Sequence, residues 1–230
     1  CEGALVMKIT FIVPALNITG GLRVVSIYAQ LLAQKGHQVT VISPNKKAST
    51  FKEKVKSVIK WKGYSFKTNF NTTFFDKHDY ELKILKEHRP IENDDVPDGD
   101  IVIATFWNTA EWMSTFSENK GKKVYFIQHY EVHPWLPLER VESTLRAPFN
   151  QIVVSQWIAD VLESKYDKKD VVVVGNGVDL QQFSAPVREK NKQVTVGVMY
   201  ADELSFKGCD TSINSVLKAR ETIPDIKLVA

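Results

Sequence analysis

A hydrophobic run that ends at Ile127 is followed directly by a polar and aromatic segment, residues 128–135, with the sequence QHYEVHPW. A histidine at the end of a strand can donate a hydrogen bond to a sugar hydroxyl or to developing negative charge. His129 is therefore the candidate catalytic residue, and a histidine merely hydrogen-bonded within a loop is the alternative. Glu131 could accept hydrogen bonds from acceptor hydroxyls or orient His129. His133 precedes a proline and is interpreted as part of a turn.

Three tryptophans lie after expected strand ends or on the helices that follow them, at Trp107, Trp112 and Trp135. An aromatic ring can stack on the face of a sugar, but it can equally pack in the core. Trp107 is taken as the candidate contact to a sugar or acceptor.

Two adjacent glycines, Gly20 and Gly21, separate the first expected strand from the helix after it. Glycine lets the backbone approach a ligand closely, and the start of a helix offers free N–H groups to an anion. The dinucleotide fingerprint GxGxxG is not present here. On spacing alone, a tight turn explains the glycines as well as a phosphate-binding loop does. Arg23, in the same helical turn, is a further candidate contact to a sugar or acceptor.

Short β-branched runs alternate with segments whose apolar residues recur every three or four positions. The expected strands are Lys8–Val13, Gln38–Ile42, Ile101–Thr105, Lys123–Ile127, Gln151–Val154 and Val171–Val174. The expected helices are Gly21–Gln34, Asn108–Ser117, Leu136–Leu145 and Gln156–Lys165. Alternation of this kind, with strands apolar on both faces, predicts an α/β fold with a doubly wound, Rossmann-like parallel sheet. Such sheets bind ligands at the carboxyl ends of their strands, where the segments above begin.

A polar stretch without periodicity predicts a linker at residues 186–192, between a first, Rossmann-like domain at 7–185 and a second unit at 193–230. The second unit is expected to contain strand Gln193–Met199, helix Thr211–Arg220 and strand Ile226–Val229. One β-α-β unit cannot bury a sufficient core. We therefore expect an incomplete domain and a chain that is a fragment of a longer protein. Residues 1–6, before Met7, are interpreted as a vector remnant or a processed end.

Composition narrows the class of protein. The 230 residues are 43% hydrophobic and 25% charged. This composition is typical of globular domains with hydrophobic cores, and it excludes a disordered chain, collagen and a coiled coil. The net charge of +3 does not indicate a nucleic-acid binder. No apolar run approaches the roughly 20 residues of a membrane-spanning helix. Two cysteines, Cys1 and Cys209, form no disulfide framework, so a reducing compartment such as the cytoplasm is expected.

A basic and aromatic segment, Lys46–Lys67, contains eight lysines and one acidic residue. Lysines near an anionic membrane contribute about 1 kcal/mol each, enough for peripheral attachment at the inner face of the cell membrane. A solvated loop whose lysine stems cover apolar surface is the alternative.

Several motifs together are similar to one known family. Gly20-Gly21-Leu22-Arg23-Val24 and residues 31–42 (LLAQKGHQVTVI) resemble the opening of glycosyltransferase family 4. Residues 152–155 (IVVS) and 174–179 (VGNGVD) resemble its central stretch. Phe206-Lys207-Gly208 resembles the motif that begins its donor domain. The matches keep the family's order, and they imply a retaining enzyme of the two-domain GT-B fold, here the acceptor-side domain and the start of the donor domain.

The resemblance also implies roles for residues. Gly20 and Gly21 would border the donor's phosphates, His129 would lie beside the transferring sugar, and Lys207 would bind the donor diphosphate. His37 is in register with the family but lies away from the cleft, and we interpret it as structural. The arginine that the family carries upstream of Lys207 is not present, which puts the diphosphate contact in doubt. The family's paired glutamates fall beyond this chain, so the chain alone is expected to be inactive.

Asn176-Gly177 favours a positive φ and a sharp turn, and Asp179 can cap the turn that follows. These three residues are interpreted mainly as architecture of the cleft between the domains. No Asp-x-Asp follows an expected strand, so neither a metal nor another cofactor is implied.

The predicted function is transfer of a sugar from a nucleotide sugar to a glycan, polysaccharide or lipid-linked acceptor. A GT-B nucleotide-sugar epimerase is an enzyme alternative. A non-catalytic α/β module that binds a nucleotide or sugar is the other alternative, favoured by the missing arginine.

Overall fold

The computed structural model describes residues 5–47, 73–76, 78–180, 182–187, 189, 191–198 and 208–229. The chain divides into two compact units, residues 1–177 and residues 178–230. The division falls before the linker predicted at 186–192. Each unit is described by itself.

The first unit is built on a seven-stranded sheet with the order β3-β2-β1-β4-β5-β6-β7. Every neighbouring pair in this sheet is parallel. The strands are β1 (Lys8–Ile12), β2 (Gln38–Ser43), β3 (Glu81–Ile84), β4 (Ile101–Ala104), β5 (Lys122–Ile127), β6 (Asn150–Val153) and β7 (Val171–Val173). The predicted parallel, doubly wound sheet is therefore confirmed.

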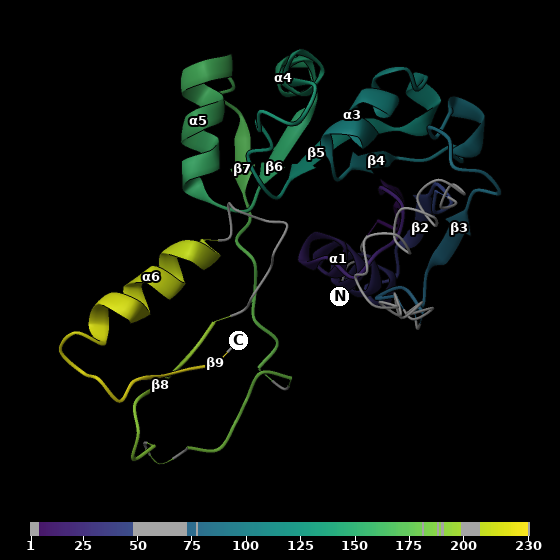
Figure 1. Cartoon of the computed structure of the whole chain (residues 1–230). Coiled ribbons are helices and arrows are strands. Elements are labelled where there is room, and N and C mark those ends of the chain that lie inside the picture. The colour runs from purple at the N-terminus through teal and green to yellow at the C-terminus, as the bar shows by residue number, and fades with distance from the viewer. Residues whose placement is uncertain are drawn as a thin grey trace, which may run out of the picture. The chain divides into compact units, whose positions relative to one another are not determined.

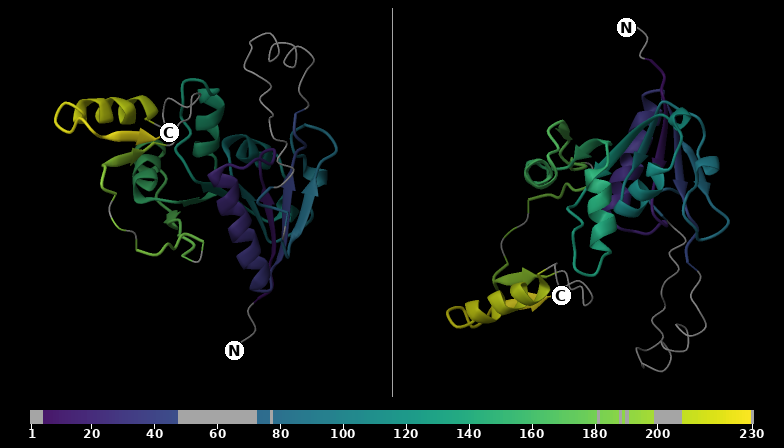
Figure 2. Two further views of the ribbon diagram at one scale, coloured as in Figure 1. Left: turned by 60° about the horizontal axis from the view of Figure 1, so that its bottom comes forward. Right: turned by 90° about the horizontal axis from the view of Figure 1, so that it is seen from above.

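Helices cover both faces of the sheet, as Figure 1 shows and as can be followed from two other sides in Figure 2. They are α1 (Gly20–Gln34), α3 (Trp107–Ser114), α4 (Leu138–Arg146) and α5 (Gln156–Tyr166). Successive strand residues point to opposite faces. Phe11 and Val41 pack with α1, whereas the neighbouring Ile12 and Ile42 pack with α3, α4 and α5. All four side chains are buried, which explains why the strands read as apolar on both faces.

Strand β3 is absent from the predicted elements. Its sequence, ELKI, has no β-branched run, and its four residues are exposed or only partly buried. It pairs with β2 alone and forms one edge of the sheet. It is a strand because it pairs with β2, and no pattern within its own four residues predicts this pairing.

The acidic residues before β4 have structural partners. Two short 3₁₀ helices, η1 (Asn93–Asp95) and η2 (Glu118–Lys120), lie in this region. The Asp95 carboxylate accepts two hydrogen bonds from the Arg89 guanidinium, at 2.6 and 2.9 Å. Asp98 binds the ammonium of the buried Lys120 at 2.8 Å, and Asp100 accepts from the Lys8 N–H at 2.7 Å. These carboxylates fasten loops at the amino ends of the strands.

The second unit contains β8 (Thr195–Gly197), α6 (Cys209–Ala219) and β9 (Lys227–Val229). The two strands pair in parallel, and Val216 of α6 is buried. The predicted β-α-β order is confirmed. Both strands are shorter than predicted, and residues 199–207 lie outside the described part.

Candidate active site

The carboxyl ends of β1, β4, β5 and β6 open into the segments that contain most of the candidate residues. Because the strands are parallel, these ends share one edge of the sheet, where ligands of doubly wound folds bind. The segment after β1 leads to α1, and the segments after β4 and β6 lead directly to α3 and α5. The segment after β5 is the longest of those after β4, β5 and β6, and it contains His129.

The start of α1 lies against the segment after β5. The side-chain amide of Gln128 donates a hydrogen bond to the carbonyl oxygen of Gly21 at 3.2 Å. A Cβ added at Gly21 would lie 3.5 Å from the Gln128 side chain, whereas one added at Gly20 would meet nothing within 4 Å. The glycine pair and the histidine segment, separated by more than 100 residues, therefore share the same edge.

The residues on both sides of His129 are attached to three different helices. Gln128 binds the start of α1, as described above. The hydroxyls of Tyr130 and of Tyr166, the last residue of α5, lie 3.0 Å apart. A carboxylate oxygen of Glu131 accepts from the Trp107 N–H, at the start of α3, at 3.1 Å. These contacts fix the backbone around His129, whose own side chain is exposed.

Glu131 is largely buried, and its electrostatics follow from that burial. Removal from water disfavours the charged carboxylate and raises its pKa from an ordinary value of 4.5 to about 8. The Trp107 N–H at the start of α3 opposes this effect, because it stabilises the charged form. Burial is the larger effect, so most Glu131 carboxyls are protonated at neutral pH. The Glu131 carboxyl is therefore suited to positioning the segment that contains His129.

Three buried polar atoms at the same edge have no protein hydrogen-bond partner, namely Trp107 Nε1, Asn108 Oδ1 and Ser155 Oγ. Trp107 and Asn108 begin α3, and Ser155 precedes α5. Unsatisfied polar groups cost free energy unless water or a ligand binds them. Their clustering after β4 and β6 agrees with a polar ligand site at this edge.

The burial of the Trp107 ring agrees with core packing, the alternative given for this tryptophan, and its contact with a sugar stays a prediction. Only 9% of the Trp107 surface is exposed, and the Arg140 guanidinium carbon lies 5.2 Å from the ring centroid. The indole therefore packs inside the first unit, with the Arg140 guanidinium over its ring. Arg23 is partly buried, with its guanidinium carbon 5.9 Å from the Phe74 ring centroid. Its role toward a sugar stays a prediction.

The segment after β7 contains the predicted cleft residues, all of them exposed. Neither Asn176 nor Gly177 has a positive φ, so the predicted sharp turn at this pair is wrong. The capping role of Asp179 is confirmed, because its carboxylate accepts from the Gln182 N–H at 3.1 Å. Asn176 and Gly177 precede the division between the units and Asp179 follows it, so their role in a cleft stays a prediction.

Two predictions fall on residues outside the described part. Lys207 is one of them, although the adjacent Gly208 precedes α6 with a φ of +70°. The basic segment Lys46–Lys67 is described only at Lys46 and Lys47. The interpretation of His37 as structural agrees with its contact, since its Nδ1 accepts from the Met7 N–H at 3.3 Å.

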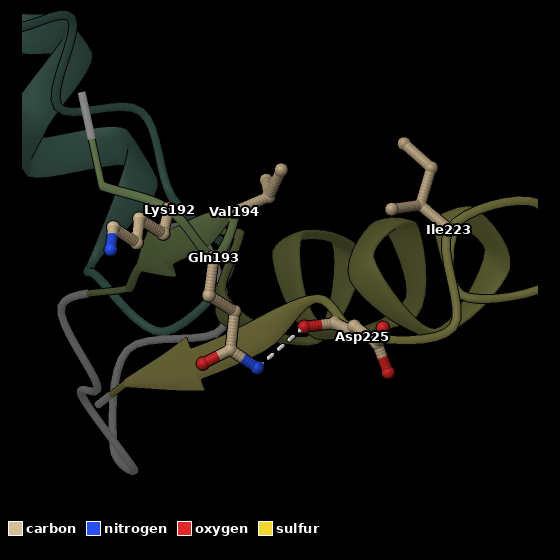
Figure 3. A pocket seen from close by; sticks show the side chains of 5 residues that line it. All are labelled: Lys192, Gln193, Val194, Ile223 and Asp225. Carbon is tan, nitrogen blue, oxygen red and sulfur yellow. Dashed lines mark hydrogen bonds between the residues drawn. The ribbon is translucent and has the colours of Figure 1, made fainter.

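A hollow in the second unit is lined by Lys192, Gln193, Val194, Ile223 and Asp225 (Figure 3). The Gln193 side chain donates to the Asp225 carbonyl oxygen at 2.8 Å across it. These residues precede β8 and β9, so the hollow lies at the amino ends of the strands. Ligands of parallel sheets bind at the opposite ends, and we do not assign a site here.

Within the part of the chain that the structure describes, no three His, Cys, Asp or Glu side chains are grouped as metal ligands. Among the described helices, none is long and apolar enough to cross a bilayer.

Gln128 and Tyr130 are the residues that sequence reasoning missed. Both lie inside the quoted segment, and their position beside His129 was the available indication. Their partners, Gly21 and Tyr166, become neighbours only when the sheet and its helices assemble.

Fold and site together define a doubly wound α/β protein with a glycine pair and a histidine at the ligand-binding edge. The family model of Glycosyltransferase Family 4 matches residues 18–182, which include both features. The chain belongs to glycosyltransferase family 4, and glycosyl transfer is its general activity class. Among solved structures, the chain is similar to the crystal structure of LpCGTa in complex with UDP, with 11% sequence identity and a TM-score of 0.49. The alignment covers 98% of this chain and 70% of the LpCGTa chain. No curated protein matches the chain significantly.

Proposed function

We propose that this protein transfers a sugar from a nucleotide-sugar donor to a glycan, polysaccharide or lipid-linked acceptor. In this proposal the anomeric configuration is retained and no metal ion takes part. Membership of glycosyltransferase family 4 supports the transfer itself. The donor class, the stereochemistry and the acceptor class are our inference.

The hydrogen bond between Gln128 and Gly21 is the observation that carries the proposal. It brings the first turn of α1 and the His129 segment to one edge of the sheet. A departing nucleoside diphosphate gains negative charge, which the N–H groups at a helix start can stabilise. The open space beside Gly20 lets a phosphate approach that backbone closely.

His129 then acts on the sugar that leaves the diphosphate. Its exposed imidazole donates a hydrogen bond to a sugar hydroxyl or to developing charge. The contacts of Gln128, Tyr130 and Glu131 hold the segment in advance, so little order has to be gained when the donor binds. Lys207, in the second unit, would add a positive charge at the diphosphate.

Retention in this proposal needs no carboxylate nucleophile. Glu131 is largely removed from water, and its raised pKa of about 8 keeps most of its carboxyls protonated at neutral pH, which makes it a poor nucleophile. The incoming hydroxyl and the leaving group would instead use the same face of the sugar. The bond between the anomeric carbon and the diphosphate oxygen breaks, and a bond between the anomeric carbon and the acceptor oxygen forms. The leaving diphosphate takes up the proton that the acceptor hydroxyl loses.

The test is incubation of the full-length protein with a panel of nucleotide sugars while nucleoside diphosphate release is measured. We expect release with at least one donor and at least a hundredfold loss in the His129→Ala variant, in line with the size of general acid–base effects. The matched control is His88→Ala, because His88 is exposed after β3 and its ring nitrogen Nδ1 contacts the carbonyl oxygen of Asn45 in a loop.

The alternatives give different results in the same assay. Tight binding of a nucleotide sugar without release supports a binding module and contradicts the proposal. Conversion of the donor to an epimer supports the epimerase. Release that is equal in wild type and His129→Ala contradicts the role of the histidine.

A further inference from the structure

The segment after Glu131 forms a proline turn that presents Trp135. The Leu136 N–H donates to the His133 carbonyl at 2.9 Å, which closes a four-residue turn. Pro134 occupies the second position, where its fixed φ favours the turn, and Pro137 follows directly. Trp135 lies at the third position with 61% of its surface exposed.

Three aromatic rings stack in succession along this segment. The ring centroids of His129 and His133 are 5.2 Å apart with an interplanar angle of 25°. Those of His133 and Trp135 are 4.6 Å apart, and the two planes differ by only 6°. The stack therefore leads from the candidate catalytic histidine to an exposed indole two ring spacings away.

Stacking and prolines together limit the motion of this indole. A parallel imidazole fixes the plane of the ring, and the two prolines restrict the backbone on each side. A binding group that is ordered before the ligand arrives loses less entropy on binding. Packing in the core does not explain the position of Trp135, because this side chain is exposed. Trp107, by contrast, is a buried tryptophan of the same unit.

We propose that Trp135 binds a pyranose ring of the acceptor by stacking against its C–H face. The inference rests on the proposed function and names the acceptor class as a glycan with a sugar unit beyond the one that reacts. The C–H faces of pyranoses are apolar and match the flat face of an indole in size. Because two ring spacings separate Trp135 from His129, the sugar unit bound at Trp135 is a different unit from the one that reacts at His129.

The experiment uses the 230-residue chain labelled with 5-fluorotryptophan, whose five tryptophans give separate ¹⁹F signals. The Trp135 signal is identified by its loss in Trp135→Phe. Maltotetraose, cellotetraose and chitotetraose are then titrated to millimolar concentration. We expect at least one of them to shift the Trp135 signal in a saturable manner.

Variants separate stacking from a general effect. Trp135→Ala should weaken the binding measured by calorimetry at least tenfold, and Trp135→Phe should keep most of it because a flat ring remains. Trp157→Ala is the matched control, since Trp157 is 52% exposed on α5 and lies outside the stack. Its affinity should equal that of the wild type.

Two results would overturn the inference: a Trp135 signal that none of the three tetrasaccharides moves, or equal weakening in Trp135→Ala and Trp157→Ala. Donor hydrolysis to nucleoside diphosphate, measured in parallel on the full-length protein, keeps the two proposals apart. Hydrolysis without sugar binding at Trp135 contradicts this inference alone, whereas absence of hydrolysis contradicts the proposed function.

Discussion

The buried carboxyl of Glu131 makes the stability of the first unit depend on pH. Its pKa is about 8 in the folded chain, against an ordinary value of 4.5. Between these values the folded state holds a proton that the unfolded state has released. The contribution of this carboxyl to the free energy of unfolding is therefore complete below pH 4.5. It decreases as the pH rises from 4.5 toward 8 and is lost above pH 8. Glu131→Gln removes the titration and keeps an amide oxygen that can accept from the Trp107 N–H.

The magnitude follows from the difference between the two pKa values. Each pKa unit corresponds to 1.36 kcal/mol, so the full effect is about 5 kcal/mol. Between pH 5 and pH 8, wild type should lose about 3 to 4 kcal/mol relative to Glu131→Gln. This loss is a large part of the 5–15 kcal/mol that stabilises a typical domain.

Urea unfolding followed by tryptophan fluorescence measures the effect, because all five tryptophans lie in the first unit. The free energy of unfolding is determined at pH 5, 6, 7 and 8 for wild type, Glu131→Gln and the control Glu139→Gln. Glu139 is exposed in the first turn of α4, so its variant should follow the wild-type curve. A ¹³C titration of the Glu131 carboxyl should give a midpoint near 8. Parallel stability curves for wild type and Glu131→Gln, or a midpoint near 4.5, would refute the reasoning.

Two further substitutions test the scaffold. Gly121 has a φ of +99°, and a Cβ there would lie 2.4 Å from the Asp100 carbonyl carbon. Gly121→Ala should therefore lower the free energy of unfolding by about 2 to 4 kcal/mol, and a loss below 0.5 kcal/mol in urea unfolding would contradict the described backbone. Tyr130→Phe removes the hydroxyl that meets Tyr166, so we expect a loss of about 1 kcal/mol in the same assay and a decrease in nucleoside diphosphate release. Unchanged stability and release would show that this contact does not hold the His129 segment.

Much of the fold could be predicted from the sequence because its cause is local. Strands such as β1 bury side chains on both faces and are therefore rich in apolar residues, and the amphipathic segments between them predict helices. His129 and the glycine pair were predictable as site candidates because each lies in the stretch between the end of a strand and the first turn of the next helix. Strand β3 was not predictable, because its pairing with β2 depends on a neighbour about 40 residues away.

The environment of each side chain was decided by the tertiary structure. Trp107 and Trp135 look equivalent in the sequence, yet packing between helices buries the first and a proline turn exposes the second. Glu131 is an ordinary acidic residue in the sequence, but folding removes most of it from water, and this burial raises its pKa. Burial and hydrogen-bond partners depend on segments that are distant in the chain, whereas strand and helix patterns depend on neighbours. The sequence therefore determined which residues could do chemistry, and the assembled sheet and helices decided which of them lie exposed at the same edge.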